Sequence, residues 1–326
     1  MSAWVWLLLG IGLGTGACTE SDRRVNLPEK VFPSDTLRVE DCLRCLVLTE
    51  QARPSIRIVE TLTGNTVWEW QPAQAEELED PAWFSNPDEA KPVYDRKYLL
   101  VTASGGGVAL IRIADKKVVF SAYAGGNPHS AELFPDGNLA VASSTGNYLT
   151  IFRLDTAASS EAPFKQQHDL PSGHNVVWDR KREVLWSAAK NKLYSFAYNF
   201  DCEQPDVILQ DSLPLPGNNA HDLFPVFGKD SLWLTNTSDV YLIDLKARRT
   251  FRADVAHREH IKSVSSGPED YPVALLSPEE SWWSDKVRDS RGEVVFEEKG
   301  FRIYKARWFL PNAFSYPEKH VLGSCK

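Results

Sequence analysis

The chain of 326 residues lacks the features that mark several common function classes. It has one methionine, five cysteines and no run of clustered basic residues. Because phosphate backbones are bound by clustered Lys and Arg, this absence and a net charge of −8 argue against nucleic acid as a partner. No Ser/His/Asp elbow or phosphate-binding glycine loop is found either. The glycines of "SGGGVAL" at 104–110 follow one expected strand and open another, so they form a hairpin turn.

The cysteines do not form a zinc pattern. Cys42 and Cys45 make one C-x-x-C, but no second pair of this kind follows. A disulfide bond involving Cys325 would suit an oxidising compartment. Alternatively, Cys42 and Cys45 are small buried side chains that form no bond.

The N-terminal residues "MSAWVWLLLGIGLGTGACTESDRR" have an apolar core that is too short to span a bilayer comfortably, followed by small residues. No Lys or Arg precedes this core, and Thr15 stands where a lipobox usually has Leu. Nevertheless, "TGAC" resembles a lipoprotein processing site with Cys18 as the lipidated residue. We therefore expect residues 1–18 to be a signal peptide and the protein to be an exported cell-envelope lipoprotein, attached to a membrane only through its lipid. A periplasmic or secreted protein is the alternative.

What the chain does contain is a repeat. His129, His174, His221 and His260 recur at intervals of 45, 47 and 39 residues, each at the head of an expected strand that is followed by a turn. The same spacing continues to Lys91 on one side and Lys305 on the other. Short strands and turns that repeat at this period are typical of a β-propeller with one blade per repeat. The expected fold is therefore all-β, a six-bladed β-propeller.

The sixth repeat is incomplete after "FRIYKARWF", and the missing strands are found near the other end of the chain, in residues 45–72. We expect these N-terminal strands to close the last blade, which leaves no open sheet edge. The resulting division is a linker at 19–40, the propeller at 41–316 and a C-terminal tail at 317–326.

The inner strands of a propeller face one central channel, so the residues at the repeat position should form a ring. Its expected members are the four histidines, the two lysines and Arg307. Three interpretations stay open. The ring stabilises the blades; or His129, His174, His221 and His260 hold a divalent metal (Mn, Zn or Fe); or Lys91, Lys305 and Arg307 bind an anionic or sugar ligand.

A second unusual stretch is "SPEESWWSDKV" at 277–287, where Trp282 and Trp283 are candidates for a sugar-binding platform. Adjacent strand residues point to opposite faces, so at most one of them faces a given pocket. Packing of one tryptophan between blades is the alternative.

The ordered motifs "PHSAELFPDGNLAVAS", "GHNVVWDRKREVLWSA", "AHDLFPV", "HIKSVS", "EESWWS" and "YKARW" resemble an uncharacterised family of secreted bacterial six-bladed β-propellers. The resemblance covers about residues 40–312 and implies the fold, but no activity. A more distant likeness, at the level of the fold, is to oligogalacturonate lyases, whose channel histidines hold a metal beside basic residues that bind uronates. By that analogy the four histidines would be metal ligands.

The expected function is thus a cell-envelope propeller whose central pocket binds a carbohydrate-like or anionic small molecule. It would be a metal-assisted lyase or hydrolase, or else a binding or scaffold propeller without catalysis. The sequence leaves open whether it is an enzyme.

Overall fold

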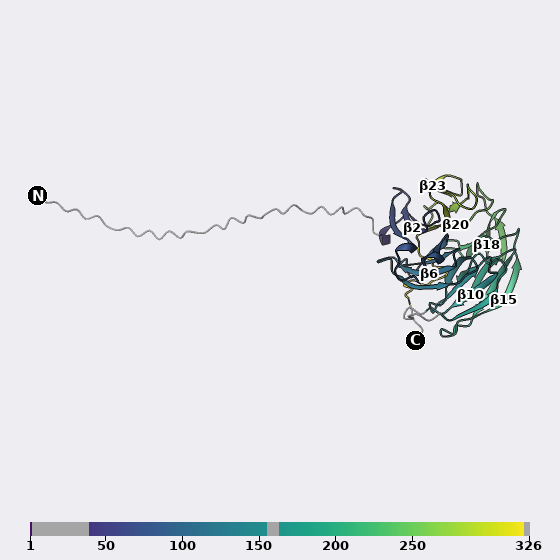
Figure 1. The fold of residues 1–326 in the computed structure, drawn as a ribbon. Coiled ribbons are helices and arrows are strands. Elements are labelled where there is room, and N and C mark those ends of the chain that lie inside the picture. The colour runs from purple at the N-terminus through teal and green to yellow at the C-terminus, as the bar shows by residue number, and fades with distance from the viewer. Residues whose placement is uncertain (2–38, 155–162, 323–326) are drawn as a thin grey trace. The chain divides into compact units, whose positions relative to one another are not determined.

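A computed structural model describes Met1, residues 39–154 and residues 163–322. It consists of six four-stranded antiparallel sheets, and the ribbon colour advances round the ring from β2 through β6, β10, β15 and β18 to β20 and β23 (Figure 1). The fold is a six-bladed β-propeller, as the repeat predicts.

Each of the first three blades follows the chain from its inner to its outer strand. Blade 1 contains β4 (Pro87–Val93), β5 (Tyr98–Ala103), β6 (Gly107–Arg112) and β7 (Val118–Tyr123). Blade 2 contains β8 (Pro128–Leu133), β9 (Leu139–Ser143), β10 (Tyr148–Phe152) and β11 (Lys165–Asp169). Blade 3 contains β12 (Val177–Asp179), β13 (Val184–Ala189), β14 (Lys192–Tyr198) and β15 (Val207–Pro214).

The next two blades have the same order, and the sixth combines both ends of the described chain. Blade 4 contains β16 (Asp222–Pro225), β17 (Ser231–Thr235), β18 (Val240–Asp244) and β19 (Arg249–Arg252). Blade 5 contains β20 (Ser263–Ser265), β21 (Ala274–Leu276), β22 (Lys286–Asp289) and β23 (Val294–Glu297). Blade 6 contains β24 (Ile303–Trp308), β1 (Cys45–Glu50), β2 (Ser55–Glu60) and β3 (Thr66–Trp70). The described 3₁₀ helices are η1 (Val39–Asp41), η2 (Pro72–Gln74) and η3 (Pro81–Phe84).

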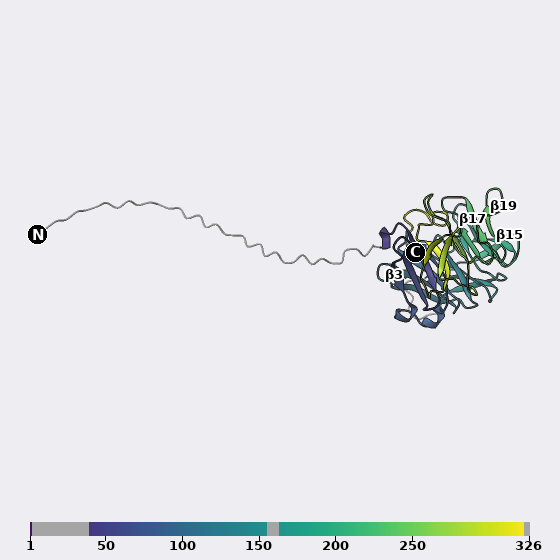
Figure 2. The same ribbon diagram turned by 90° about the horizontal axis from the view of Figure 1, so that it is seen from above.

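Blade 6 confirms the predicted closure of the ring. Its inner strand β24 pairs antiparallel with β1, with Trp308 opposite Leu46 and Ile303 opposite Glu50. The purple N-terminal strands and the yellow C-terminal strand accordingly lie side by side (Figure 2). Closure from both ends pairs the sheet edges that would otherwise be free at the junction.

The core lies between the blades. Six buried apolar clusters each combine side chains from two neighbouring blades. Between blades 2 and 3, for example, Phe134 stacks on Tyr198 with ring centroids 3.8 Å apart and meets Trp178 edge-on at 5.5 Å. Because alternate residues of a strand point to opposite faces, each sheet contributes to the cluster on either side of it. This packing fixes the blades around the channel.

The structure answers one of the cysteine expectations. Cys42 and Cys45 are both 2% exposed and form a disulfide bond with each other, so the alternative that they remain unbonded is wrong. Cys202 is disulfide-bonded as well. Cys18 and Cys325 lie outside the described residues, as do the expected signal peptide beyond Met1 and the linker up to residue 38. In the described part of the chain, no helix is long and apolar enough to cross a membrane.

Candidate functional site

The inner strands place the predicted cations in the channel, but as members of a buried ion network. The network consists of three cations, Lys91, Lys305 and Arg307, and three carboxylates, Glu89, Glu132 and Asp222, each of which is at most 3% exposed. The sequence reading picked the three cations and missed that each has a carboxylate partner.

The contacts within this network are close. The Lys91 ammonium lies 3.0 Å from the Glu132 carboxylate and 3.4 Å from Glu89. Lys305 lies 3.4 Å from both Glu89 and Asp222. The two Arg307 Nη atoms donate to the two Asp222 oxygens at 2.5 and 2.7 Å, and Nη2 also donates to Glu89 at 2.6 Å. Three positive and three negative charges therefore neutralise one another, and none of the three cations has a free charge to offer a ligand.

The network also sets the charge states of its members. Although burial raises the pKa of Glu89, the ammonium groups of Lys305 and Lys91 and the Arg307 guanidinium outweigh it, so the pKa of this carboxyl is well below its usual range. For Glu132 burial prevails over Lys91 and Tyr316, and its pKa is raised. The carboxylates of Asp222 and Glu89 likewise raise the pKa of Arg307, so that its charge persists despite complete burial.

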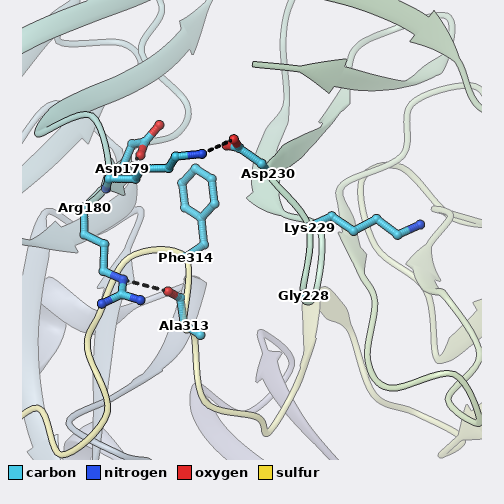
Figure 3. A pocket seen from close by; sticks show the side chains of 8 residues that line it. Asp179, Arg180, Gly228, Lys229, Asp230, Ala313 and Phe314 are labelled. Carbon is cyan, nitrogen blue, oxygen red and sulfur yellow. Dashed lines mark hydrogen bonds and ion pairs between the residues drawn. The ribbon is translucent and has the colours of Figure 1, made fainter. Parts of the chain in front are cut away.

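The C-terminal segment lies at the mouth where the inner strands end, which we call the second mouth. Residues 309–322, the C-terminal strap, cross it: the Tyr316 hydroxyl donates a hydrogen bond to Glu132, and the Leu133 amide donates to Tyr316 Oη at 3.3 Å. His320 stacks on Tyr316, with ring centroids 4.8 Å apart. Arg180 Nε donates to the Ala313 carbonyl at 3.0 Å, and Phe314 lies on one wall of a cavity of about 290 Å³ beside the strap (Figure 3).

The first mouth, where the inner strands begin, carries the histidines. The rings of His129 and His174 are 4.6 Å apart, and those of His174 and His221 are 5.7 Å apart. They come from the starts of blades 2, 3 and 4. The structure thus brings together three of the four predicted histidines.

The prediction for the fifth blade was wrong by two residues. His260 is exposed and adopts a left-handed backbone, with φ of 58°. Its place is taken by Lys262. The backbone amides of His221 and Lys262 make the same contact in their blades, to Thr235 O at 2.8 Å and to Leu276 O at 2.9 Å, and each residue directly precedes its inner strand.

Lys262 differs from the lysines of the ion network because no described residue is its partner. It is 9% exposed, and no hydrogen bond or ion pair to its ammonium is found among the described residues. Burial, together with the nearby charge of Lys305, lowers the pKa of Lys262 to about 8. The first mouth therefore holds a largely buried lysine, 9% exposed, for which the described residues provide no counter-charge.

The histidines beside Lys262 are held neutral. Burial and the neighbouring His129 lower the pKa of His174 to about 3, while burial and the charge of Lys262 lower that of His221 to about 2. His174 Nδ1 donates to the Ser172 carbonyl at 2.9 Å, so Nε2 of the neutral ring is the hydrogen-bond acceptor. His221 Nδ1 and the Asn175 amide nitrogen are buried without a hydrogen-bond partner in the described part of the chain. Of these atoms, His174 Nε2 is the one open to a bound molecule, whereas His221 Nδ1 and the Asn175 amide nitrogen are enclosed by the protein.

The tryptophans lie in the loop between β21 and β22, on the side of the first mouth, because β21 runs antiparallel to β20. Trp282 is 52% exposed, and its Nε1 donates to Gln51 Oε1 at 3.0 Å. Trp283 is half-buried, with the Arg302 guanidinium 5.0 Å from its ring centroid. Trp282 therefore offers an exposed ring, whereas Trp283 packs against a side chain.

The described side chains do not fit the metal centre that the likeness to the lyases implies. Among residues 39–154 and 163–322, no three His, Cys, Asp or Glu side chains are grouped to hold a metal ion. His260, the fourth ligand in that analogy, is exposed. One nitrogen of His174 bonds the Ser172 carbonyl and one nitrogen of His129 lies 3.2 Å from Asp88 Oδ2, which leaves one further nitrogen on each ring.

Because His174 and His221 are neutral in the folded protein, we expect its stability to fall in acid. In the unfolded chain a histidine takes up a proton near pH 6.5, whereas His174 and His221 stay neutral in the folded protein down to about pH 3 and 2. The unfolded state therefore binds more protons below pH 6.5, and the free energy of unfolding falls as the pH falls. We expect a loss of about 1–2 kcal/mol per histidine between pH 7 and pH 5. Urea unfolding at the two pH values measures it.

The variant His221→Asn should lose less stability than the wild type over this pH range. The exposed His257 serves as the control, since His257→Asn should leave the difference unchanged. Equal pH dependence in all three proteins would refute a burial effect at His221.

The sequence profile of a family of unknown function matches residues 3–324. No curated protein matches the chain. Among solved structures, a protein of unknown function from Bacteroides caccae is similar at 15% identity, with a TM-score of 0.56, over 81% of this chain and 98% of the other. Dihydro-heme d1 dehydrogenase NirN is similar at 15% identity, with a TM-score of 0.48, over 80% of this chain and 55% of the other. Kuenenia stuttgartiensis hydrazine synthase is similar at 10% identity, with a TM-score of 0.40, over 67% and 80%. At these identities the similarity to the first structure concerns the fold alone.

Proposed function

Because the chain belongs to the DUF6528 family, for which no function is established, we propose a function from the site itself. The first mouth of the propeller binds a small hydroxylated anion such as a sugar acid. Lys262 supplies the opposite charge, and His174 and His221 make hydrogen bonds to the rest of the ligand. The protein acts as a binding propeller.

The observation that carries this proposal is the charge of Lys262, which no described residue compensates. Burying an ammonium without a partner is costly, and buried charges in proteins are normally paired. In the same channel, Lys91 and Lys305 are each paired with two carboxylates. An anionic group of a ligand at Lys262 would supply the missing partner.

The histidines indicate that the ligand carries hydroxyl groups. A neutral His174 whose Nδ1 donates to Ser172 presents Nε2 as an acceptor, which suits a ligand O–H and repels a carboxylate oxygen. Exposed Trp282 offers a ring against which the apolar face of a sugar could pack. A ligand with one anionic group and several hydroxyls meets all three requirements.

Direct binding measurements test the proposal. Glucuronate, glucose and inorganic phosphate are titrated into the wild type and into Lys262→Met by isothermal titration calorimetry. A hydrogen bond to a charged group contributes about 1.5–3 kcal/mol, so glucuronate should bind the variant about 10- to 100-fold more weakly. Glucose, which lacks the charge, should bind the wild type more weakly than glucuronate does.

The matched control is Lys116→Met, because Lys116 is an exposed lysine of an outer loop of blade 1. It should bind glucuronate as the wild type does. Equal affinity of Lys262→Met and the wild type for every anion would overturn the proposal, as would equal affinity of the wild type for glucose and glucuronate.

A further inference from the structure

Three lysines of this propeller are buried around the channel, and they divide into two kinds. Lys91 and Lys305, 3% and 1% exposed, lie 3.0–3.4 Å from carboxylates that hold them as ammonium ions. Lys262 is somewhat more exposed, at 9%, and has no carboxylate partner in the described part of the chain. A buried primary amine that no acid holds protonated is chemically distinct from the other two, because it can act as a nucleophile.

We infer that Lys262 captures 2-oxo acids at the first mouth as a covalent imine. The inference rests on the proposed anion site and names the ligands that react there: small carboxylates, sugar acids among them, that carry a carbonyl next to the carboxylate. Lys262 is placed for this reaction because it lies at the head of an inner strand, beside the strand that His221 precedes: the His221 amide donates to the Thr235 carbonyl at 2.8 Å, and the Thr235 hydroxyl donates to the Ile261 carbonyl at 2.7 Å. The C-terminal strap makes its contacts at the opposite mouth.

The step balances without any further reactant. The amine of Lys262 attacks the carbonyl carbon, and the electron pair of the C=O bond moves to oxygen to give a carbinolamine. This oxygen then leaves as water with two protons that come from the original ammonium. The product is an iminium ion, in which nitrogen keeps one proton and its positive charge beside the ligand's carboxylate. Anion pairing is thus retained after the new C–N bond forms.

The neighbouring side chains support the proton transfers. The nitrogen must lose a proton before attack and the leaving oxygen must gain one, and an uncharged imidazole can take up and return such a proton. His174 Nε2 is an acceptor because Nδ1 donates to the Ser172 carbonyl at 2.9 Å. His221 Nδ1 is buried without a hydrogen-bond partner among the described residues. His174 Nε2 is therefore the nitrogen that is open to exchange a proton, and its ring lies 5.7 Å from that of His221.

Reductive trapping tests the inference. The full chain is incubated at neutral pH with pyruvate and sodium cyanoborohydride, which reduces an iminium ion to a stable secondary amine, and modified lysines are located by peptide mass spectrometry. We expect modification of Lys262 at least about tenfold above that of exposed Lys116, which reacts only as an ordinary surface amine. Lys262→Arg keeps the positive charge and should abolish the modification at this position.

L-lactate, which has a hydroxyl where pyruvate has the carbonyl, separates the two proposals. If lactate binds in a manner that depends on Lys262 but pyruvate leaves Lys262 unmodified, the covalent step is wrong and the anion site stands. If lactate, pyruvate and glucuronate all fail to bind, both proposals are wrong. Modification of Lys116 and Lys262 to the same extent also overturns the covalent step. Mapping on the wild type decides the question even if the arginine variant does not fold.

Discussion

Replacing Arg307 by methionine is expected to lower the free energy of unfolding by about 3–5 kcal/mol. Arg307 is 1% exposed and donates to both Asp222 oxygens and to Glu89, so its loss leaves two carboxylates with only Lys305 and Lys91 as partners. The guanidinium also lies 4.1 Å from the centroid of the Phe224 ring, and methionine retains only part of that packing. Breaking a buried ion pair from one side is costly because it strands a charge in a medium of low dielectric constant.

A surface ion pair provides the matched control. Arg248 lies 3.0 Å from Asp211, and both side chains are more than half exposed. Arg248→Met should change the free energy of unfolding by less than about 1 kcal/mol, since exposed pairs are screened by water. Denaturant unfolding of both variants measures the difference. If Arg307→Met were as stable as Arg248→Met, the channel network would not hold the inner strands together as we describe.

Truncation of Tyr316 to alanine is the second change with a large expected effect. The ring is 6% exposed, stacks on His320 and packs in the apolar cluster between blades 1 and 2, and its hydroxyl bonds Glu132. Removing a buried aromatic side chain lowers the free energy of unfolding by about 3–5 kcal/mol. It should also release the strap from the second mouth, so limited proteolysis should cut residues 309–322 sooner than in the wild type.

Two variants separate the contributions of Tyr316. Tyr316→Phe keeps the ring and removes only the bond to Glu132, at an expected cost of about 1–3 kcal/mol. Phe251→Ala removes an aromatic ring that is 50% exposed and should cost much less than Tyr316→Ala. Similar stability and cleavage rates for Tyr316→Ala and Phe251→Ala would show that the strap is not anchored through this residue.

The six-bladed architecture could be predicted because the sequence contains one repeat per blade. Strands, turns and spacing recur every 39–47 residues, and the incomplete last repeat pointed to residues 45–72 as its missing strands. These signals are local, and a closed ring is the arrangement that hides every edge.

The site was less predictable, for two physical reasons. In blade 5 the inner strand starts at Ser263, so a turn residue, His260, matched the histidine spacing while Lys262 occupied the equivalent position. The pairing of charges was missed because it joins strands far apart in sequence, as with Arg307 and Asp222.

One contact of the ion network, between Glu89 and Lys91, could have been predicted from the sequence. Glu89 and Lys91 are two residues apart on β4, and residues at this spacing share a face of a strand, so a carboxylate beside a channel-facing lysine was foreseeable. That pattern would have indicated that Lys91 is compensated within its own blade. Lys262 has no acidic residue at this spacing, since the residues two positions away on either side are His260 and Val264.

We propose that the charge of Lys262, which no described residue compensates, creates the binding site. Lys262 lies two residues after His260, the histidine at the predicted repeat position. The most direct test is calorimetric titration of glucuronate into Lys262→Met and His260→Asn under identical conditions. We predict that Lys262→Met loses most of its affinity while His260→Asn binds as the wild type does. Loss of binding in His260→Asn with normal binding in Lys262→Met would contradict the account.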